Sequence, residues 1–275
     1  ETDAGESVPR GATPMSLGAG LGIDDFDAVA SLGRACDRLG LDVISAGNAV
    51  AWAIRAVEAG AIDAADLGLG SAPSFGDRDA ARAVIEAITA REPGVPDALA
   101  DGVEAAAGRF GGSELVPTIK SMEVPAYDPR GAPTMALAYA TSDRGACHRR
   151  SLPAETEVFG ESWTDADRVR LVIREQTITA VLWSLIADDF AGATLESDLG
   201  AEWLAAIAAV APPHPAHPPE VGERVCALPR LVHVPPGCAA PDEALPPGLA
   251  RPIRRGGHAA RAAAHEHPGQ HEDKV

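Results

Sequence analysis

The sequence predicts a mostly α-helical protein with two helical lobes, and three observations lead to this prediction. Apolar residues recur at three- and four-residue spacing through most of the first 210 residues, which is typical of the buried face of a helix. The alternation of apolar and polar residues that marks a strand is almost absent. Pro117, Pro125 and Pro129 interrupt the helical pattern, so we expect the two lobes to meet near residue 117.

The first lobe, residues 1–117, is expected to contain four helices. Asp24 or Asp25 caps the first helix, whose apolar residues from Phe26 to Leu39 fall at helical spacing, and Gly40 ends it. The other three helices are expected from about Asn48 to before Gly60, from Asp77 to before Pro93, and from near Pro96 through Leu99 and Val103. Residues 113–132 are expected to form a loop or short strands.

The second lobe, residues 118–250, is predicted to hold longer helices. We expect a short helix around Thr134–Ala140, a loop over Thr141–Arg150, a long helix from Thr164 to Phe190, and another over Asp198–Val210. Residues 204–275 contain 13 of the 23 prolines and seven of the eight histidines. This composition predicts that residues 251–275 form a disordered tail.

The charge of the chain excludes two classes of partner. The 275 residues carry a net charge of −17, which repels phosphate backbones and anionic lipids. We therefore expect neither nucleic-acid nor membrane binding, and no apolar stretch is long enough to span a bilayer.

The cysteines favour a reducing, cytoplasmic location. Cys36, Cys147, Cys226 and Cys238 form no CxxC pair and no disulfide framework. The chain starts at Glu1 without the pattern of a secretory signal, so we expect either a processed chain or an earlier true start.

The first candidate site is the segment Cys36–Asp42, in which Asp37 and Asp42 flank Gly40 and Leu41. One interpretation is a glycine helix cap between two surface acids, which is the commoner situation. The other is a ligand site, because two carboxylates around a tight turn can accept the parallel N–H bonds of an amino-pyrimidine edge such as that of a pterin.

The second candidate site is the segment Ala138–His148, followed by Arg149 and Arg150. His148 is the only histidine in the first 213 residues, and it follows a Gly-Ala pair that permits close contact with a ligand. A surface histidine beside two arginines is the alternative.

These segments together resemble the tungsten-containing aldehyde ferredoxin oxidoreductase family. Cys36–Asn48 is similar to the family's DxxGLD-x-IS-x-G segment. Further similarity lies in Glu123–Gly131, in Ala138–His148 and in shorter pieces up to about residue 249. The resemblance covers the two helical domains of that family, its domains 2 and 3, and not its β-rich N-terminal domain.

The resemblance implies an oxidoreductase that converts aldehydes to carboxylic acids and passes electrons to ferredoxin. It implies a tungsten bis-pterin cofactor, with Asp37, Gly40, Leu41 and Asp42 in the first pterin-binding motif and Arg150 near the second pterin. It places Glu1 and His148 beside the tungsten as catalytic residues, where an acid or base assists proton transfer. It implies ferredoxin and a small aldehyde as partners and leaves a homodimer open.

The chain departs from the family at the iron–sulfur cluster. The family's second motif, DxxGLC, supplies a cluster cysteine, but Trp183–Asp188 aligns there and ends in a carboxylate. The other three cluster cysteines of the family lie in a CxxCxxxC segment, which is absent from this chain. Because such clusters require thiolate ligands, we predict that the family's 4Fe-4S cluster has no ligands here.

No metal ligands are predicted among the remaining residues. His214 and His217 stand between prolines, and His265, His267 and His271 fall in the predicted tail. Two function classes therefore stay open. One is an oxidoreductase of the aldehyde ferredoxin type, and the other is a non-catalytic helical remnant or interaction module.

Overall fold

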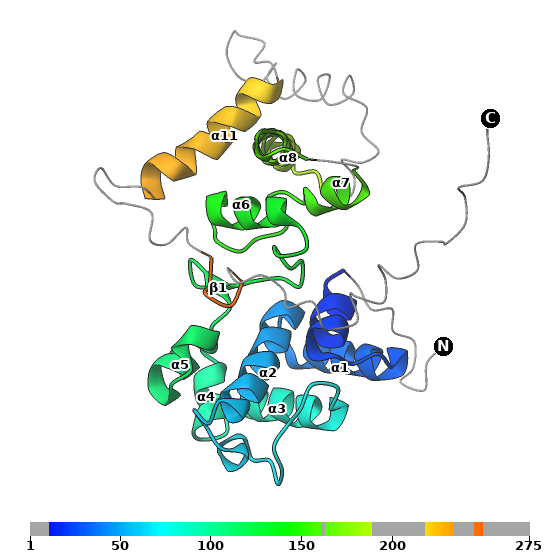
Figure 1. The fold of residues 1–275 in the computed structure, drawn as a ribbon, viewed down its shortest axis with the longest axis vertical. Coiled ribbons are helices and arrows are strands. Elements are labelled where there is room, and N and C mark those ends of the chain that lie inside the picture. The colour runs from blue at the N-terminus through cyan, green and yellow to red at the C-terminus, as the bar shows by residue number, and fades with distance from the viewer. Residues whose placement is uncertain (1–10, 161–162, 189–217, 234–244, 250–275) are drawn as a thin grey trace, which may run out of the picture.

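The computed structural model describes residues 11–160, 163–188, 218–233 and 245–249. The described chain is mostly helical, which confirms the predicted fold class. Two groups of helices lie one above the other, and the short hairpin of β1 (Thr118–Ile119) and β2 (Met122–Glu123) lies between them (Figure 1). We keep the names first and second lobe for these groups.

The first lobe is formed by five helices and several short turns. The helices are α1 (Phe26–Leu39), α2 (Val43–Glu58), α3 (Arg78–Ala90), α4 (Val95–Leu99) and α5 (Val103–Phe110). The short turns are Pro14–Gly18, Ala19–Leu21, Ala64–Leu67 and Ser113–Leu115.

Side-chain caps explain where two of these helices begin. The Asp25 carboxylate accepts from the backbone N–H of Ala28 at 2.6 Å and starts α1. The Asp77 carboxylate caps α3 in the same way, through the N–H groups of residues 79 and 80. Both starts confirm the sequence prediction. At the first position of α1, however, Phe26 is 61 % exposed, although its spacing predicted a buried side chain.

Two other predicted helices of the first lobe had wrong boundaries. The second starts at Val43 rather than near Asn48, because the Asp42 carboxylate accepts from the N–H groups of Ile44 and Ser45, both at 2.9 Å. The expected fourth helix is two helices, α4 and α5. The chain breaks between them at Gly102, whose φ of 109° is accessible almost only to glycine.

The second lobe contains α6 (Pro133–Thr141), α7 (Ala154–Phe159), α8 (Asp165–Ser184) and α11 (Pro218–His233). Thr164 caps α8 as predicted, but the helix ends at Ser184, short of the predicted Phe190. Phe190 itself, the predicted helix over 198–210 and the predicted tail 251–275 lie outside the described residues.

The sequence did not predict α7 or α11. Helix α11 packs along α8, where a Cβ at Gly222 would lie 2.4 Å from the carbonyl oxygen of Thr177. The sequence did not predict α11 because proline is rare inside helices, and this helix has two prolines in its first turn and Pro229 in its interior.

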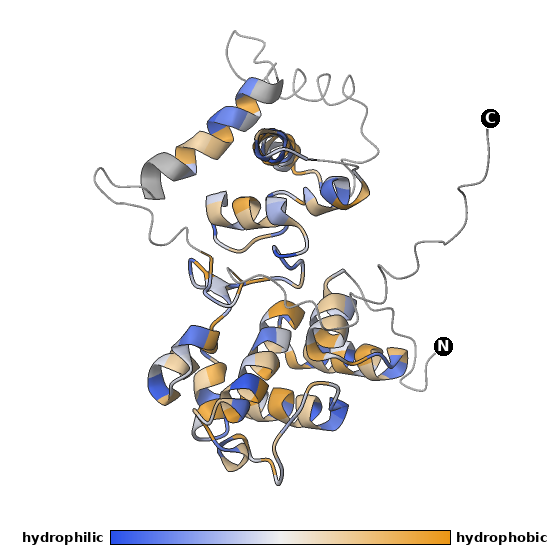
Figure 2. Cartoon of the chain, in the orientation of Figure 1, coloured by the Kyte–Doolittle hydropathy of each residue, from blue (hydrophilic) through white to orange (hydrophobic). Residues whose placement is uncertain are grey.

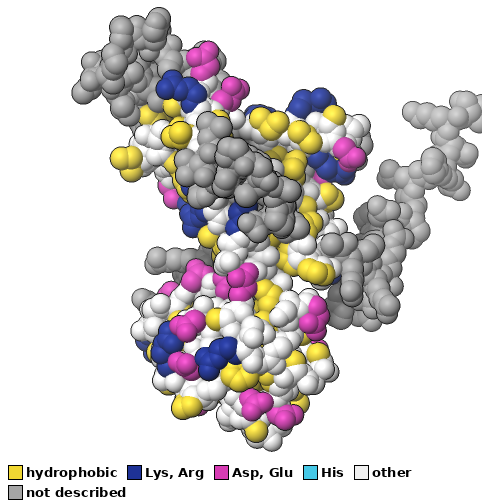
Figure 3. Space-filling view, turned by 90° about the vertical axis from the view of Figure 1, so that its left-hand side faces the viewer, with side chains coloured by type: hydrophobic (Ala, Val, Ile, Leu, Met, Phe, Trp, Pro, Cys, Tyr) yellow, Lys and Arg dark blue, Asp and Glu magenta, His cyan; other side chains and the backbone are white. Residues whose placement is uncertain are grey.

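Two apolar clusters stabilise the described chain, one in each lobe. The first is built from α1–α5 around Trp52, which is 1 % exposed and donates its indole N–H to the carbonyl oxygen of Gly112. The second surrounds Met135 and Tyr139, both fully buried. In Figure 2 apolar and polar residues alternate along the helices of the first lobe, as they do in amphipathic helices. Figure 3 shows charged side chains beside apolar ones on the surface of both lobes. The separate clusters support the predicted boundary near residue 117, which stays a prediction.

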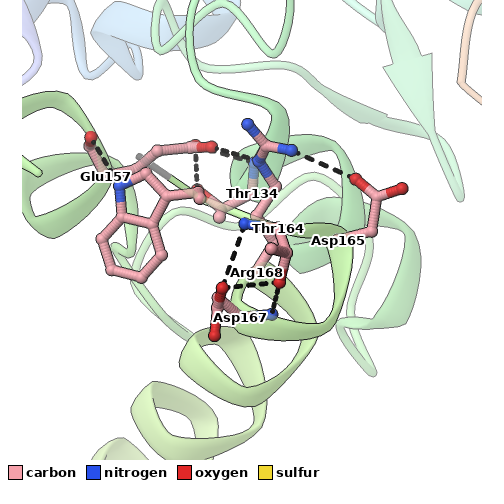
Figure 4. A network of polar contacts seen from close by, with 7 residues as sticks. Thr134, Glu157, Thr164, Asp165, Asp167 and Arg168 are labelled. Atoms are coloured by element: carbon pink, nitrogen blue, oxygen red, sulfur yellow. Dashed lines mark hydrogen bonds and ion pairs between the residues drawn. The ribbon is translucent and has the colours of Figure 1, made fainter. Parts of the chain in front are cut away.

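A buried carboxylate joins three helices of the second lobe (Figure 4). Glu157 of α7 is 8 % exposed and accepts from the backbone N–H and the hydroxyl of Thr134, at the start of α6. Its other oxygen accepts from Nε of Arg168, on α8, at 2.7 Å. Burial acts to raise the pKa of Glu157, but the bonds from Thr134 and Arg168 outweigh it and hold the pKa below its usual range.

Within the described ranges, no helix has the length and apolar character needed to cross a membrane.

Candidate functional site

The turn Cys36–Asp42 presents two exposed carboxylates around a glycine. Gly40 ends α1 in the left-handed conformation, with φ 71°, and the N–H of Leu41 donates to the carbonyl oxygen of Cys36 at 2.9 Å. Asp37 precedes this turn and Asp42 follows it, and both side chains are exposed. Nothing lies within 4 Å of a Cβ built on Gly40, so this glycine is required by its backbone conformation alone.

The pKa of Cys36, which lies at the start of this turn, depends on both acids. Its side chain is fully buried, and burial together with the charges of Asp37 and Asp42 raises the pKa of the thiol to about 11. Both carboxylates therefore affect the pKa of the same thiol. The thiol is protonated at neutral pH and is a poor metal ligand.

The start of α2 contacts the segment Glu123–Gly131, which is the second region of sequence similarity. The hydroxyl of Ser45 donates to Glu123 Oε2 at 3.1 Å. The amide of Asn48 donates to the carbonyl oxygen of Val124 at 3.0 Å. These two bonds join the lobes. Only the similarity of both segments to one family connects them at the level of sequence.

His148 contacts the same segment, Glu123–Gly131, through Tyr127. Its imidazole stacks on the ring of Tyr127, with ring centroids 5.5 Å apart and planes inclined by 28°. Burial and the charge of Glu155 raise the pKa of the Tyr127 phenol. The buried Tyr139 hydroxyl donates to the carbonyl oxygen of Tyr127 at 3.1 Å and fixes the stacking partner in place.

Gly145, three residues before His148, lies directly against the backbone of β1. A Cβ at Gly145 would lie 2.4 Å from the carbonyl oxygen of Ile119, and the φ of this residue is 102°. Gly145 therefore allows the loop to lie against β1. The close contact that the structure shows for this glycine is with the backbone of the chain itself, and contact of the Gly-Ala pair with a ligand stays a prediction.

Both arginines after His148 contact acids. Arg150 makes a two-pronged bond to Asp143, at 2.6 and 2.8 Å, and its guanidinium lies 4.4 Å from the ring centroid of Trp183. Arg149 donates to Asp188 at 2.9 Å. Asp188 ends the segment Trp183–Asp188, which was predicted from the resemblance to correspond to a DxxGLC motif, and in this structure it forms an ion pair.

A cleft of about 1080 Å³ lies between α2 and the segment 124–130. Its walls include apolar side chains and two cations, Arg55 and Arg130. Ser16 also lines it, and the Ser16 hydroxyl is enclosed without a hydrogen-bond partner in the described part of the chain. Gly47 and Asn48 of α2 line this cleft, whereas Asp37, Asp42 and His148 are not part of its lining.

The structure thus links the two candidate segments through residues 123–127 without placing all predicted site residues in one cavity. Asp37, Gly40, Leu41 and Asp42 form one turn, and His148 and Arg150 belong to another loop. Glu1, the other predicted catalytic residue, lies outside the described residues. Among the residues that the structure describes, no three His, Cys, Asp or Glu side chains are grouped as a metal site.

Comparison with known proteins gives one consistent result. The family model described as aldehyde ferredoxin oxidoreductase, domains 2 and 3, matches residues 1–270. The tungsten-containing aldehyde ferredoxin oxidoreductase of Pyrococcus furiosus is 38% identical over 182 residues, which cover 63% of this chain and 30% of that protein. The proteins of the same description from Pyrococcus abyssi and Thermococcus kodakarensis are 35% and 34% identical over the same coverage. The aligned region spans less than a third of each of these relatives.

Proposed function

The chain belongs to the aldehyde ferredoxin oxidoreductase family, and on that premise we propose that it is part of an enzyme that oxidises aldehydes to carboxylic acids. In this reaction water supplies the second oxygen of the acid, the C–H bond of the aldehyde breaks, and two electrons and two protons leave. We propose ferredoxin as the electron acceptor. The observation that carries the proposal is the pair of exposed carboxylates around Gly40, in the segment that resembles the family's first pterin motif.

The residues of this turn fit a pterin. Asp37 and Asp42 present carboxylates to solvent, and an ionised carboxylate is an acceptor for two N–H donors. One oxygen of Asp42 is engaged by the start of α2, so in this proposal Asp37 makes the stronger contribution. Arg150 would act near a second pterin through the guanidinium edge that Asp143 does not hold. A bound tungsten–pterin group would supply the two-electron redox chemistry.

His148 has the chemistry for proton transfer in this scheme. A histidine changes charge between pH 5 and 8, so it can accept one of the protons that the oxidation releases. Stacking on Tyr127 orients the imidazole. We propose Glu1 as the second proton-transfer group, from the resemblance alone.

A 4Fe-4S cluster does not fit the described residues. Cys36 and Cys147 are buried, Cys226 is half-buried, and burial raises the pKa of Cys36 and of Cys226. Among the described residues, no three His, Cys, Asp or Glu side chains are grouped, and Asp188 is paired with Arg149. This observation favours the second function, a non-catalytic helical module that keeps the fold and half of a pterin site. No step of the proposed reaction is assigned to a cluster.

One experiment separates these two functions. The chain is produced with tungstate supplied, and tungsten, pterin, iron and sulfide are measured beside aldehyde oxidation with ferredoxin or a dye as acceptor. Tungsten and pterin with aldehyde-dependent reduction support the enzyme. Folded protein without cofactor or activity supports the module and overturns the proposed function.

A further inference from the structure

Lys120, in the turn between β1 and β2, reaches the end of α6 with its side chain. Its Nζ donates to the carbonyl oxygen of Ser142 at 2.8 Å and to that of Ala140 at 3.3 Å. Ser142 is the C-terminal cap of α6, and Ala140 lies in the last turn of this helix. The last carbonyl groups of a helix have no partner within the helix, and a lysine ammonium is a suitable donor for them. The Lys120 side chain therefore ties the end of α6 to the hairpin.

The backbone of Lys120 has a conformation that is unusual for lysine. The φ angles of Lys120 and Ser121 are 51° and 59°, as in the two-residue hairpin turns in which asparagine and glycine are the usual residues. A side chain makes this left-handed conformation less favourable. Glycine would fit the turn better but could make no bond to α6, so the side-chain bonds of Lys120 offset the cost of its backbone.

Strand β1 also holds the other end of the loop that follows α6. The N–H of Ala146 donates to the carbonyl oxygen of Ile119 at 3.3 Å. The N–H of Cys147 then donates to the carbonyl oxygen of Gly145 at 2.6 Å, which makes a tight turn directly before His148. The segment 142–146 is thus attached to the hairpin at both of its ends, and His148 follows two residues later.

The same hairpin leads into the segment that supplies the other ring of the stack. Strand β2 ends at Glu123, and Tyr127 lies four residues further along the chain. The N–H of Val124 donates to the carbonyl oxygen of Pro117, just before β1, at 2.8 Å. The hairpin is therefore a common support for the loop that carries His148 and for the segment that carries Tyr127.

We propose that Lys120 is a positioning residue that holds the loop of His148 in the place where the imidazole stacks on Tyr127. Lys120 acts through His148 and is assigned no contact with the reacting atoms. Its effect on catalysis rests on the proposed function, in which His148 accepts a proton. Its effect on the placement of the imidazole does not depend on that function.

Proton NMR of the full chain tests the placement without a cofactor. His148→Asn identifies the imidazole signals of His148, and Tyr127→Ala gives their chemical shifts without the stacked ring. We expect Lys120→Met to move these signals most of the way toward their positions in Tyr127→Ala, because the bonds to α6 are lost. Lys120→Arg keeps the positive charge and the N–H donors and should keep the shifts of the parent.

Two further variants make this test specific. Lys120→Gly removes the same bonds while suiting the left-handed turn, so it provides a folded variant even if Lys120→Met does not fold. Ser121→Ala is the matched control, since Ser121 lies in the same turn with an exposed side chain. We expect Ser121→Ala to keep the shifts of the parent. Parent shifts in a folded Lys120→Gly variant, or equal changes in Ser121→Ala, overturn the proposal.

The rate of aldehyde oxidation by the enzyme with bound cofactor tests the catalytic effect. Lys120→Gly should lower this rate by about 10- to 100-fold, because a displaced group loses its orientation toward the substrate. The double variant with His148→Asn should be no slower than His148→Asn alone, since Lys120 acts through His148. Additive losses would contradict this. If the parent itself oxidises no aldehyde, the proposed function fails, and the NMR result still decides whether Lys120 positions His148.

Discussion

The imidazole of His148 stacks on the ring of Tyr127, three residues after Val124, which accepts a hydrogen bond from Asn48 of α2. We expect the two rings to be energetically coupled. Aromatic pairs of this geometry contribute about 0.5–1.5 kcal/mol beyond the area that they bury. A double-mutant cycle with Tyr127→Ala and His148→Ala, measured by urea unfolding, should give a coupling energy in this range. Tyr127→Phe keeps the ring and should retain the coupling, and additive single variants would show that the stacking has no energetic effect.

The proposed roles of Asp37 and His148 predict different effects of substitution in the enzyme with bound cofactor: loss of cofactor for Asp37 and loss of rate for His148. Asp37→Ala removes an acceptor for pterin N–H groups, at a cost of about 1–3 kcal/mol per unpaired group, so pterin and tungsten content should fall with activity. His148→Asn should keep cofactor content near normal and lower the aldehyde oxidation rate by about 100- to 10,000-fold, through loss of proton transfer.

Asp37 is the better variant for this comparison because Asp42 also caps α2. Asp42→Ala would lose about 1 kcal/mol of helix stability in addition to any effect on the cofactor. Metal and pterin content are measured beside the rate for each variant. Full turnover in His148→Asn, or full cofactor in Asp37→Ala, would contradict the assigned roles.

Glu157 makes the stability of the second lobe depend on acid pH. Its folded pKa is held below the unfolded value, so its contribution is complete above about pH 4.5. The contribution is lost as pH falls from there through the lower folded pKa, because the protonated group loses the bond from Arg168. We expect Glu157→Gln to lose about 1–3 kcal/mol at neutral pH and to show a smaller decrease on acidification.

Urea unfolding between neutral and acid pH checks this expectation. Glu155→Gln is the matched control, since Glu155 lies on the same helix with an exposed side chain. A parent and a Glu157→Gln variant that lose equal stability with falling pH would refute the role of this carboxylate.

The net charge of −17 predicts a marked effect of salt on the melting temperature. Like charges repel in the compact state, and salt screens them beyond about 10 Å at 0.1 M. Thermal midpoints should therefore rise as sodium chloride is increased. A midpoint that is flat or falls with salt would disprove the idea.

The sequence predicted helices best where an acid or a hydroxyl precedes an apolar run. Asp25, Asp77 and Thr164 each begin a helix as expected, since a cap is a local interaction. Asp42 has the same local signal, but its helix was predicted to start later, because the residue was interpreted as a surface acid beside the glycine cap or as a ligand contact and not as a helix cap. Helix α11 was missed because its prolines argue against a helix, while its packing on α8 favours one.

The local turns of the candidate site could be predicted from the sequence, but the contacts between residues distant in the sequence could not. The glycine turn between Asp37 and Asp42 is a local pattern, and its geometry agrees with the expected cap. The contacts of Ser45 with Glu123 and of Tyr127 with His148 join residues from different lobes or loops, which periodicity does not register.

Gly40 and Gly145 differ in how much variation their positions tolerate. At Gly40 only the backbone conformation resists a side chain, and asparagine adopts that conformation at modest cost. At Gly145 the backbone of β1 occupies the space itself, so every other residue requires the loop that carries His148 to move. The fold therefore tolerates asparagine at position 40 better than any side chain at position 145.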